Sequence, residues 1–281
     1  MRKHNYLNNK DILSEIHKSK SSFCSYTEDD FHQYDLIIPL QGPHGTLEEG
    51  LQKINIRTIA EAKRNKAKRI QNQNFDAAKA QGQKVKLAEF EVNWKKIDKK
   101  DLVFRIMTYN HIPDEPGRKK TPKTVADTKT KLNFPPYQHY KFDETDNLVC
   151  VGKSHWEGGM ENGYFNKQSG KVTNKLAHMW MKLCERYATR GNVRGYTYND
   201  EMRGQAILQL TQIGLQFDES KSQNPFAYYT AAVTNSFVRV INLEKRNQNI
   251  RDDILEMNDM TPSYTRQSQR EWDANNSSQK S

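Results

Sequence analysis

The sequence predicts a mainly α-helical protein, in which a helical bundle at about 171–257 follows a mixed, basic segment with helices and a few short strands. Two observations support this fold class. In the C-terminal part, apolar residues recur with the 3.6-residue period of a helix. Before that part they form short runs that proline and glycine interrupt. The stretch NKQSG at 166–170 is the expected boundary between the two.

The N-terminus predicts a short helix at 8–20, because Asn8 or Asn9 can cap it and its isoleucine and leucine side chains share one face. The last residues are polar and predict a flexible tail. The expected parts are an N-terminal helix at 1–20, a basic domain at 21–165, the helical domain at 166–257, and the tail at 258–281.

The stretch 57–100 carries 13 Lys and Arg against 5 Asp and Glu, and most of its residues are good helix formers. It predicts one helix, or two helices separated at Gly82. Its cationic face is either simply solvated or contacts nucleic acid without sequence preference. The side chains that would make such contacts are Lys63, Arg64, Lys66, Lys68 and Arg69.

The rest of the basic domain predicts less regular structure. DLVFRIMTY at 101–109 is typical of a buried strand or short helix, and LVCV at 148–151 is typical of a strand. Residues 110–136 contain five prolines and predict a loop or linker.

The helical domain predicts three helices. The first buries an apolar stripe at helical spacing, made of Leu176, Met179, Trp180, Leu183 and Tyr187. The second begins near Asn199, with acidic residues in its first turn. One of its faces is polar and is either a protein contact surface or plainly solvated. That face contains Glu201, Gln205, Gln209 and Gln212.

The third helix begins at Asn224 and Pro225, a cap followed by a proline at the first helical position. Its aromatic residues either belong to the core or stack on unpaired bases. A second face, on which Tyr228 also lies, carries asparagine and arginine, which can bind base edges or phosphates unless they are merely solvated. Those residues are Asn235, Arg239, Asn242 and Arg246.

The net charge of +10 favours a nucleic acid or another anionic surface as partner. No apolar run long enough to span a membrane occurs, and the N-terminus lacks the apolar core of a signal peptide. The three cysteines predict no disulfide framework. Cys150 and His155 are two potential zinc ligands, but nothing near them in the sequence completes a ligand set, so no metal and no cofactor are expected.

The block 196–246 resembles region 2 of the sigma-70 superfamily: an acidic helix start, an FD turn, an aromatic cluster and a helix with a basic end. It is most similar to the late-transcription sigma factors of T-even-like phages, in the form carried by cyanobacterial phages. The resemblance covers about 171–262, is weaker over 4–20, and does not extend to 21–165.

The resemblance implies an initiation factor, not an enzyme, that works with host core RNA polymerase in the host cytoplasm and melts a TATA-like −10 element of late promoters. The polar face of the second helix would bind the clamp helices of the largest catalytic subunit. A phage co-activator is a further partner that the family allows. The residues that would bind or melt promoter DNA are Phe226, Tyr228, Tyr229, Asn235, Arg239, Asn242, Lys245 and Arg246.

Three departures from the family stand out. Thr230 occupies a position where housekeeping sigma factors usually carry a tryptophan, no second helix-turn-helix module follows residue 262, and the tail lacks an apolar-acidic end that could bind a sliding clamp. One alternative is a polymerase-binding regulator, for example an inhibitor, that does not itself contact DNA. Another is a metal-dependent nuclease that uses Glu89, Glu91 and Lys95.

Overall fold

The computed structural model describes residues 7–278, which form two compact units. Unit 1 contains residues up to 179 together with 212–228, and unit 2 contains 180–211 and everything from 229 onward. The expected domain boundaries at 21 and 166 do not coincide with these units. The N-terminal helix and the segment 212–228 belong to the same unit as the basic domain, because side chains far apart in the sequence pair there.

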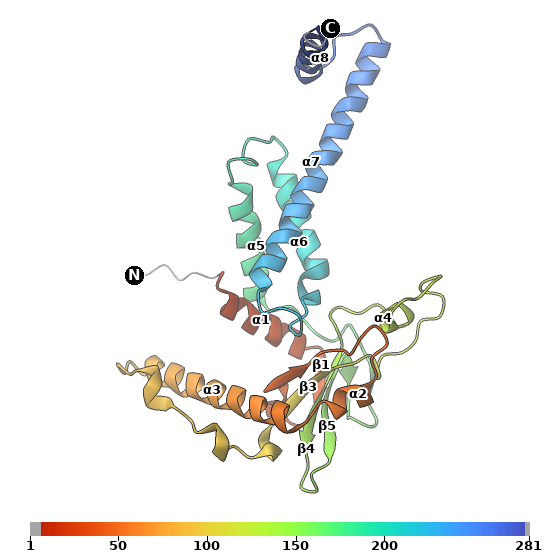
Figure 1. The fold of residues 1–281 in the computed structure, drawn as a ribbon. Coiled ribbons are helices and arrows are strands. Elements are labelled where there is room, and N and C mark those ends of the chain that lie inside the picture. Colours follow the sequence, from red (N-terminus) through yellow and green to blue (C-terminus); the bar gives the residue numbers. More distant parts are fainter. Residues whose placement is uncertain (1–6, 279–281) are drawn as a thin grey trace. The chain divides into compact units, whose positions relative to one another are not determined.

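Unit 1 is built on a five-stranded mixed sheet with the order β1-β5-β4-β3-β2 (Figure 1). All neighbouring strands are antiparallel except β2 and β3, which are parallel. The expected strand at 148–151 is confirmed as β5, and 101–109, expected as a buried strand or a short helix, contains the strand β3. The strands are β1 (Cys24–Tyr26), β2 (Leu36–Ile38), β3 (Val103–Met107), β4 (Tyr137–Phe142) and β5 (Leu148–Ser154), and a separate hairpin joins β6 (Trp156–Glu157) to β7 (Tyr164–Phe165).

The helices of unit 1 begin and end where the sequence provides caps. Helix α1 (Asn9–Ser21) is capped by Asn8, as expected. Helix α3 (Ile56–Ala80) begins with a capping box between Asn55 and Thr58, and it ends just before Gly82, whose positive φ a helix does not accommodate. The short helices are α2 (Leu47–Gln52), α4 (Val125–Thr128), η1 (Asp29–His32), η2 (Leu87–Phe90), η3 (Trp94–Lys96) and η4 (Lys99–Asp101).

The core of unit 1 lies between the sheet and the helices α2 and α3. All five residues of β3 are buried, and apolar side chains of β2, β4 and α3 pack around it. The segment 110–136 is largely loop, as expected, and contains only the one-turn helix α4 among its described elements. The buried cluster consists of Ile38, Ala62, Leu102, Phe104, Ile106, Tyr140 and Phe142.

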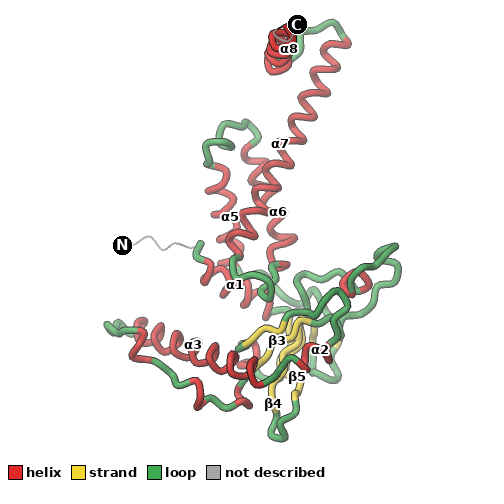
Figure 2. The backbone as a smooth tube through the Cα atoms, in the orientation of Figure 1, coloured by secondary structure: helices red, strands yellow, loops and turns green. Residues whose placement is uncertain are grey.

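In unit 2 the described residues form helices and loops (Figure 2). The three helices expected in the helical domain are confirmed, and the third continues well past residue 246 as one helix. They are α5 (Asn174–Ala188), α6 (Asn199–Ile213, followed by the turn η5, Gly214–Gln216) and α7 (Pro225–Met257), and each extends into unit 1 at one end.

Two aromatic pairs join α5 to α7 inside unit 2. Trp180 meets Tyr229 edge-on at 5.8 Å between ring centroids, and Tyr187 meets Phe237 at 4.9 Å. Edge-to-face pairs add about 0.5–1.5 kcal/mol each beyond the burial of their surface. This core fixes which face of α7 is turned to solvent.

Within the tail that was expected to be flexible, residues 264–278 form a further helix, α8 (Tyr264–Ser278). Its N-terminal side is bonded to the end of α7. The Arg266 guanidinium pairs with Asp253 at 2.6 Å and with Glu256 at 3.2 Å, and the Ser263 hydroxyl donates to Asp252 at 2.7 Å. Polar pairs of this kind produce no apolar periodicity in the sequence, so the sequence pattern did not predict α8.

Candidate nucleic-acid interface

The predicted DNA-binding face of α7 is exposed over its whole length in unit 2. Asn235, Arg239, Asn242 and Arg246 are separated by four, three and four residues, a spacing that puts them on one side of a helix. All four side chains are exposed, and Lys245 is exposed beside them. The stripe can therefore donate hydrogen bonds and offers three positive charges to a ligand.

The opposite side of the same helix is packed. Val233, Phe237 and Val240 are buried, together with Tyr229 one turn earlier. Because these contacts fix the rotation of α7 about its axis, the polar stripe is held facing solvent. A stripe on such a rigid support binds with little loss of backbone entropy.

The three aromatic residues expected to capture bases differ in availability. Tyr229 is 1% exposed and forms part of the core of unit 2, so its assignment to base capture is wrong. Tyr228, in unit 1, is half-buried: its ring packs against Phe217, and its hydroxyl donates to the carbonyl of Ile213 at 3.1 Å. Phe226 is 36% exposed and is the most accessible of the three.

The first turn of α7 is capped from two directions within unit 1. The Asn224 side chain accepts a hydrogen bond from the backbone N–H of Ala227 at 3.1 Å, as the expected cap. Asn9, at the start of α1, accepts one from the N–H of Phe226, also at 3.1 Å. The N-terminal helix thus fixes the backbone of the exposed aromatic residue.

A buried ionic cluster holds the segment that precedes α7. A Glu219 carboxylate oxygen lies 2.7 Å from Arg105 Nη1 in β3, and the other lies 3.4 Å from Lys20 Nζ in α1. Lys20 also donates to the carbonyl of Phe217 at 2.7 Å. Burial raises the pKa of the Glu219 carboxyl, but Lys20 and Arg105 more than offset this, so the pKa is lowered overall. Glu219 is therefore ionised, and its carboxylate binds the segment that follows Phe217 and Asp218 to the sheet.

The remaining donors of Arg105 are satisfied by histidines. Its Nε donates to His139 Nε2 at 2.9 Å, and its Nη2 lies 3.2 Å from His17 Nδ1. The rings of Tyr34 and Tyr137 lie 3.8 and 3.9 Å from the guanidinium carbon. Burial and the charge of Arg105 lower the pKa of His17 to about 3 and that of His139 well below its usual value. Both histidines are neutral at physiological pH, as acceptors for Arg105 must be.

The face of α6 assigned to polymerase is solvent-exposed. Glu201 and Gln205 are exposed in unit 2, and Gln209 is half-buried. Gln212, at the end of the helix that belongs to unit 1, is exposed as well. Leu208 shares this side of the helix and is 55% exposed, a feature that the sequence analysis did not include.

The five basic residues of α3 do not all face solvent. The Arg69 guanidinium pairs with the buried Asp35 at 2.9 Å and donates to the carbonyl of Tyr34 at 2.8 Å. Lys66 donates to the carbonyl of Asp101, and Arg64 lies over the ring of Trp94. Arg69 and Lys66 are used in these bonds within unit 1, so their assignment to DNA contact is corrected, whereas Arg64 is exposed and stays a candidate. Lys63 is half-buried and Lys68 is exposed, and both stay candidates.

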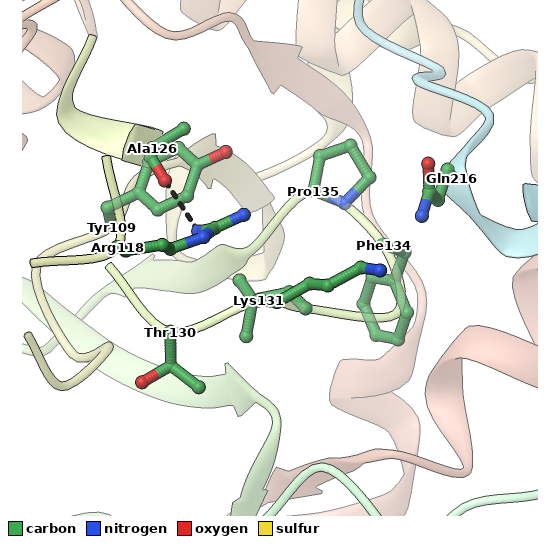
Figure 3. A pocket seen from close by; sticks show the side chains of 9 residues that line it. Tyr109, Arg118, Ala126, Thr130, Lys131, Phe134, Pro135 and Gln216 are labelled. Carbon is green, nitrogen blue, oxygen red and sulfur yellow. Dashed lines mark hydrogen bonds between the residues drawn. The ribbon is translucent and has the colours of Figure 1, made fainter. Parts of the chain in front are cut away.

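Two pockets in unit 1 offer little to a nucleic acid. One, of about 310 Å³, lies against the 110–136 loop and is lined by Arg118 and Lys131 (Figure 3). Arg118 is used by the loop itself, since it donates to the carbonyls of Ala126 and Lys129. The other, of about 470 Å³, is lined by Asp35, Glu61 and Glu219, whose carboxyl groups make it unsuitable for phosphate.

Within the described residues there is neither a candidate metal-binding cluster nor a candidate membrane-spanning helix. Between residues 7 and 278, no three His, Cys, Asp or Glu side chains lie close enough to hold a metal ion. Glu89, Glu91 and Lys95 are exposed at short turns, and Cys150 is half-buried while His155 is buried. Among the helices of this range, none is both long and apolar enough to cross a membrane.

No family model, no curated protein and no solved structure matches this chain.

Proposed function

We propose that this chain is a phage sigma factor that binds host core RNA polymerase and directs it to late promoters with a TATA-like −10 element. It acts in the host cytoplasm as an initiation factor, while the polymerase carries out synthesis. The observation that supports this most is the exposed stripe of Asn235, Arg239, Asn242 and Arg246 on α7. Arginine and asparagine are the side chains that bind guanine and adenine edges in pairs of hydrogen bonds, and arginine also binds phosphate.

Promoter melting is assigned to the start of α7. Extruding a base from the duplex costs a few kcal/mol, and stacking on an aromatic ring returns about 1–3 kcal/mol for each base. Phe226 is exposed, its backbone N–H is bonded to Asn9, and Asn224 caps the next residue, so the backbone that carries its ring is fixed. Tyr228, two residues further on, is half-buried and contributes the exposed part of its ring.

Polymerase binding is assigned to the exposed side of α6, with Glu201, Gln205 and Leu208 in unit 2 and Gln212 beyond it. We expect this surface to dock on the clamp helices of the largest catalytic subunit. A phage co-activator is compatible with the same assignment.

Run-off transcription tests this function. Cyanobacterial core polymerase with this protein, on a template with an AT-rich late promoter, should give a transcript of defined length. The Arg239→Ala/Arg246→Ala variant should lose it, whereas Arg186→Ala, an exposed arginine on α5, should not. Absence of specific initiation by the wild-type protein defeats the proposal.

The burial of Tyr229 favours a second candidate, a polymerase-binding regulator that makes no DNA contact, because it removes one of the three proposed base-stacking residues. Such a regulator would inhibit transcription directed by the host's own sigma factor. The Arg239→Ala/Arg246→Ala variant would then inhibit as strongly as the wild type, and a Leu208→Glu variant would not.

A further inference from the structure

The second half of α7 carries an apolar stripe that the protein leaves uncovered. Leu243, Ile250, Ile254 and Met257 are 51, 47, 54 and 84% exposed. They continue the face that Tyr229, Val233 and Val240 bury against the rest of unit 2. The buried face thus runs on for about five turns beyond the residues that cover its first part.

The chain's own last helix does not cover this stripe. Helix α8 is bonded to α7 through Gln248, Asp252, Asp253 and Glu256. On a helix with 100° per residue, Gln248, Asp252 and Glu256 lie roughly 130–170° around the axis from the centre of the apolar stripe, and Asp253 lies about 70° from it. Because α8 lies on the far side of α7, another molecule has to cover the stripe.

The stripe has the spacing of a coiled coil. With Asn247 and Ile254 at position a, Leu243, Ile250 and Met257 fall at position d, so every a and d residue from 243 to 257 is apolar except Asn247. A single polar residue at an a position lowers the stability of a coiled coil and fixes its register. This pattern indicates a helical partner of defined register.

The charged residues beside the apolar stripe favour, as partner, a second copy of α7 in antiparallel orientation. With the twofold axis between Gln248 and Asn249, Leu243 lies against Ile254 of the second copy. Glu244 then faces Arg251 of the second copy on one side, and Arg246 faces Asp253 of the second copy on the other. The parallel register would instead place Arg246 against Arg251 of the second copy.

We propose that α7 forms an antiparallel two-helix coiled coil with a second copy of this chain over residues 243–257. Twofold symmetry makes the interface self-complementary, so each favourable contact occurs twice. Asn247 and its counterpart flank the axis, and Asp253 meets Arg246 of the second copy while it keeps its pair with Arg266. The inference does not rest on the proposed function, although a dimer would share Arg246 with the proposed DNA contact.

Sedimentation equilibrium of the full chain tests the proposal without DNA or polymerase, between about 1 and 300 μM, a range that covers micromolar to sub-millimolar dissociation constants. The wild type should show a reversible monomer–dimer equilibrium. Ile254→Glu should abolish the dimer, and Leu208→Glu, an equally exposed apolar position on α6, should not. A wild type that stays monomeric throughout, or a dimer unaffected by Ile254→Glu, overturns the proposal.

A charge exchange tests the orientation. Arg251→Glu should raise the dissociation constant roughly tenfold, because it turns two attractive pairs into repulsive ones. Glu244→Arg/Arg251→Glu should restore wild-type association. In a parallel dimer, Arg251→Glu would tighten binding instead, since it would face Arg246 of the second copy, and that result contradicts the antiparallel register. Far-UV circular dichroism checks that each variant keeps its helix content.

Discussion

Arg105 Nη1 lies 2.7 Å from a carboxylate oxygen of Glu219, although the two residues are 114 positions apart in the sequence. The pair joins the sheet of the basic domain to the turn before α7. It makes the segment 21–165, which the resemblance to sigma region 2 does not cover, part of the support for the proposed base-capturing residue.

The Glu219→Ala variant should lower the free energy of unfolding by about 3–5 kcal/mol, because it leaves the buried Arg105 without its counter-charge. Denaturant unfolding followed by fluorescence measures this. Asp114→Ala removes a carboxylate that pairs with Lys129 at an exposed site, and it should cost less than about 1 kcal/mol. Equal losses in the two variants would show that the cluster contributes no more than a surface pair.

Acid should destabilise unit 1. Burial lowers the pKa of His17 and His155 to about 3 and of His111 to about 4, and it lowers that of His139 well below its usual value. The unfolded chain therefore binds more protons than the folded one below about pH 6.5, and each histidine should cost on the order of 2 kcal/mol by pH 5.

The lowered pKa of Glu219 acts in the same direction at still lower pH, because its stabilisation is present above the unfolded pKa and is lost as the carboxylate is protonated. Unfolding free energies at pH 7.5 and 5 check this prediction, and His17→Gln should reduce the difference. Equal stability at the two pH values would mean that these histidines are not buried in neutral form.

Alanine variants of Phe226 and Tyr229 should separate an effect on protein stability from an effect on promoter strand opening. Tyr229→Ala should cost about 3 kcal/mol or more, because it empties the space beside Trp180. Phe226→Ala should leave stability nearly unchanged and impair opening of the −10 element. Thermal denaturation and permanganate footprinting of unpaired thymines measure the two effects. Normal opening by Phe226→Ala would show that its ring captures no base.

The polar stripe on α7, which contains Asn235, Arg239, Asn242 and Arg246, should dominate the salt dependence of DNA binding. Each phosphate contact contributes about 0.9 to the slope of log affinity against log salt concentration, so Arg239→Ala/Arg246→Ala should reduce the slope by about 2 if both bind phosphate. Fluorescence anisotropy with a labelled promoter duplex measures it. An unchanged slope would place the phosphate contacts elsewhere.

Substitutions of the basic residues of α3 should differ in their effect on the free energy of unfolding. Arg69→Ala should destabilise unit 1 by about 1–3 kcal/mol, since it removes a partner of the buried Asp35. Lys68→Ala, whose side chain is exposed, should change stability by less than about 0.5 kcal/mol. Denaturant unfolding compares the two, and similar losses would contradict the difference in burial.

The sequence by itself determined the long helices α1, α3, α5, α6 and α7, but not α8, because helical periodicity, caps and breakers act over a few residues. Asn8, Asn224–Pro225 and Gly82 mark ends that the structure confirms to within a few residues. Short apolar runs likewise indicated β3 and β5. The resemblance to sigma region 2 added the assignment of roles, and these stay proposals.

Only the tertiary structure decided which side chains are free to act. Phe226 and Tyr229 are three positions apart on one helix, yet one is exposed and the other lies in the core, because α5 approaches α7 on a single side. Arg69 and Lys68 are adjacent, yet Arg69 is bound to Asp35 and to the carbonyl of Tyr34, which lies 35 positions earlier. Burial and ion pairing depend on neighbours that are distant in sequence, and no local pattern encodes them.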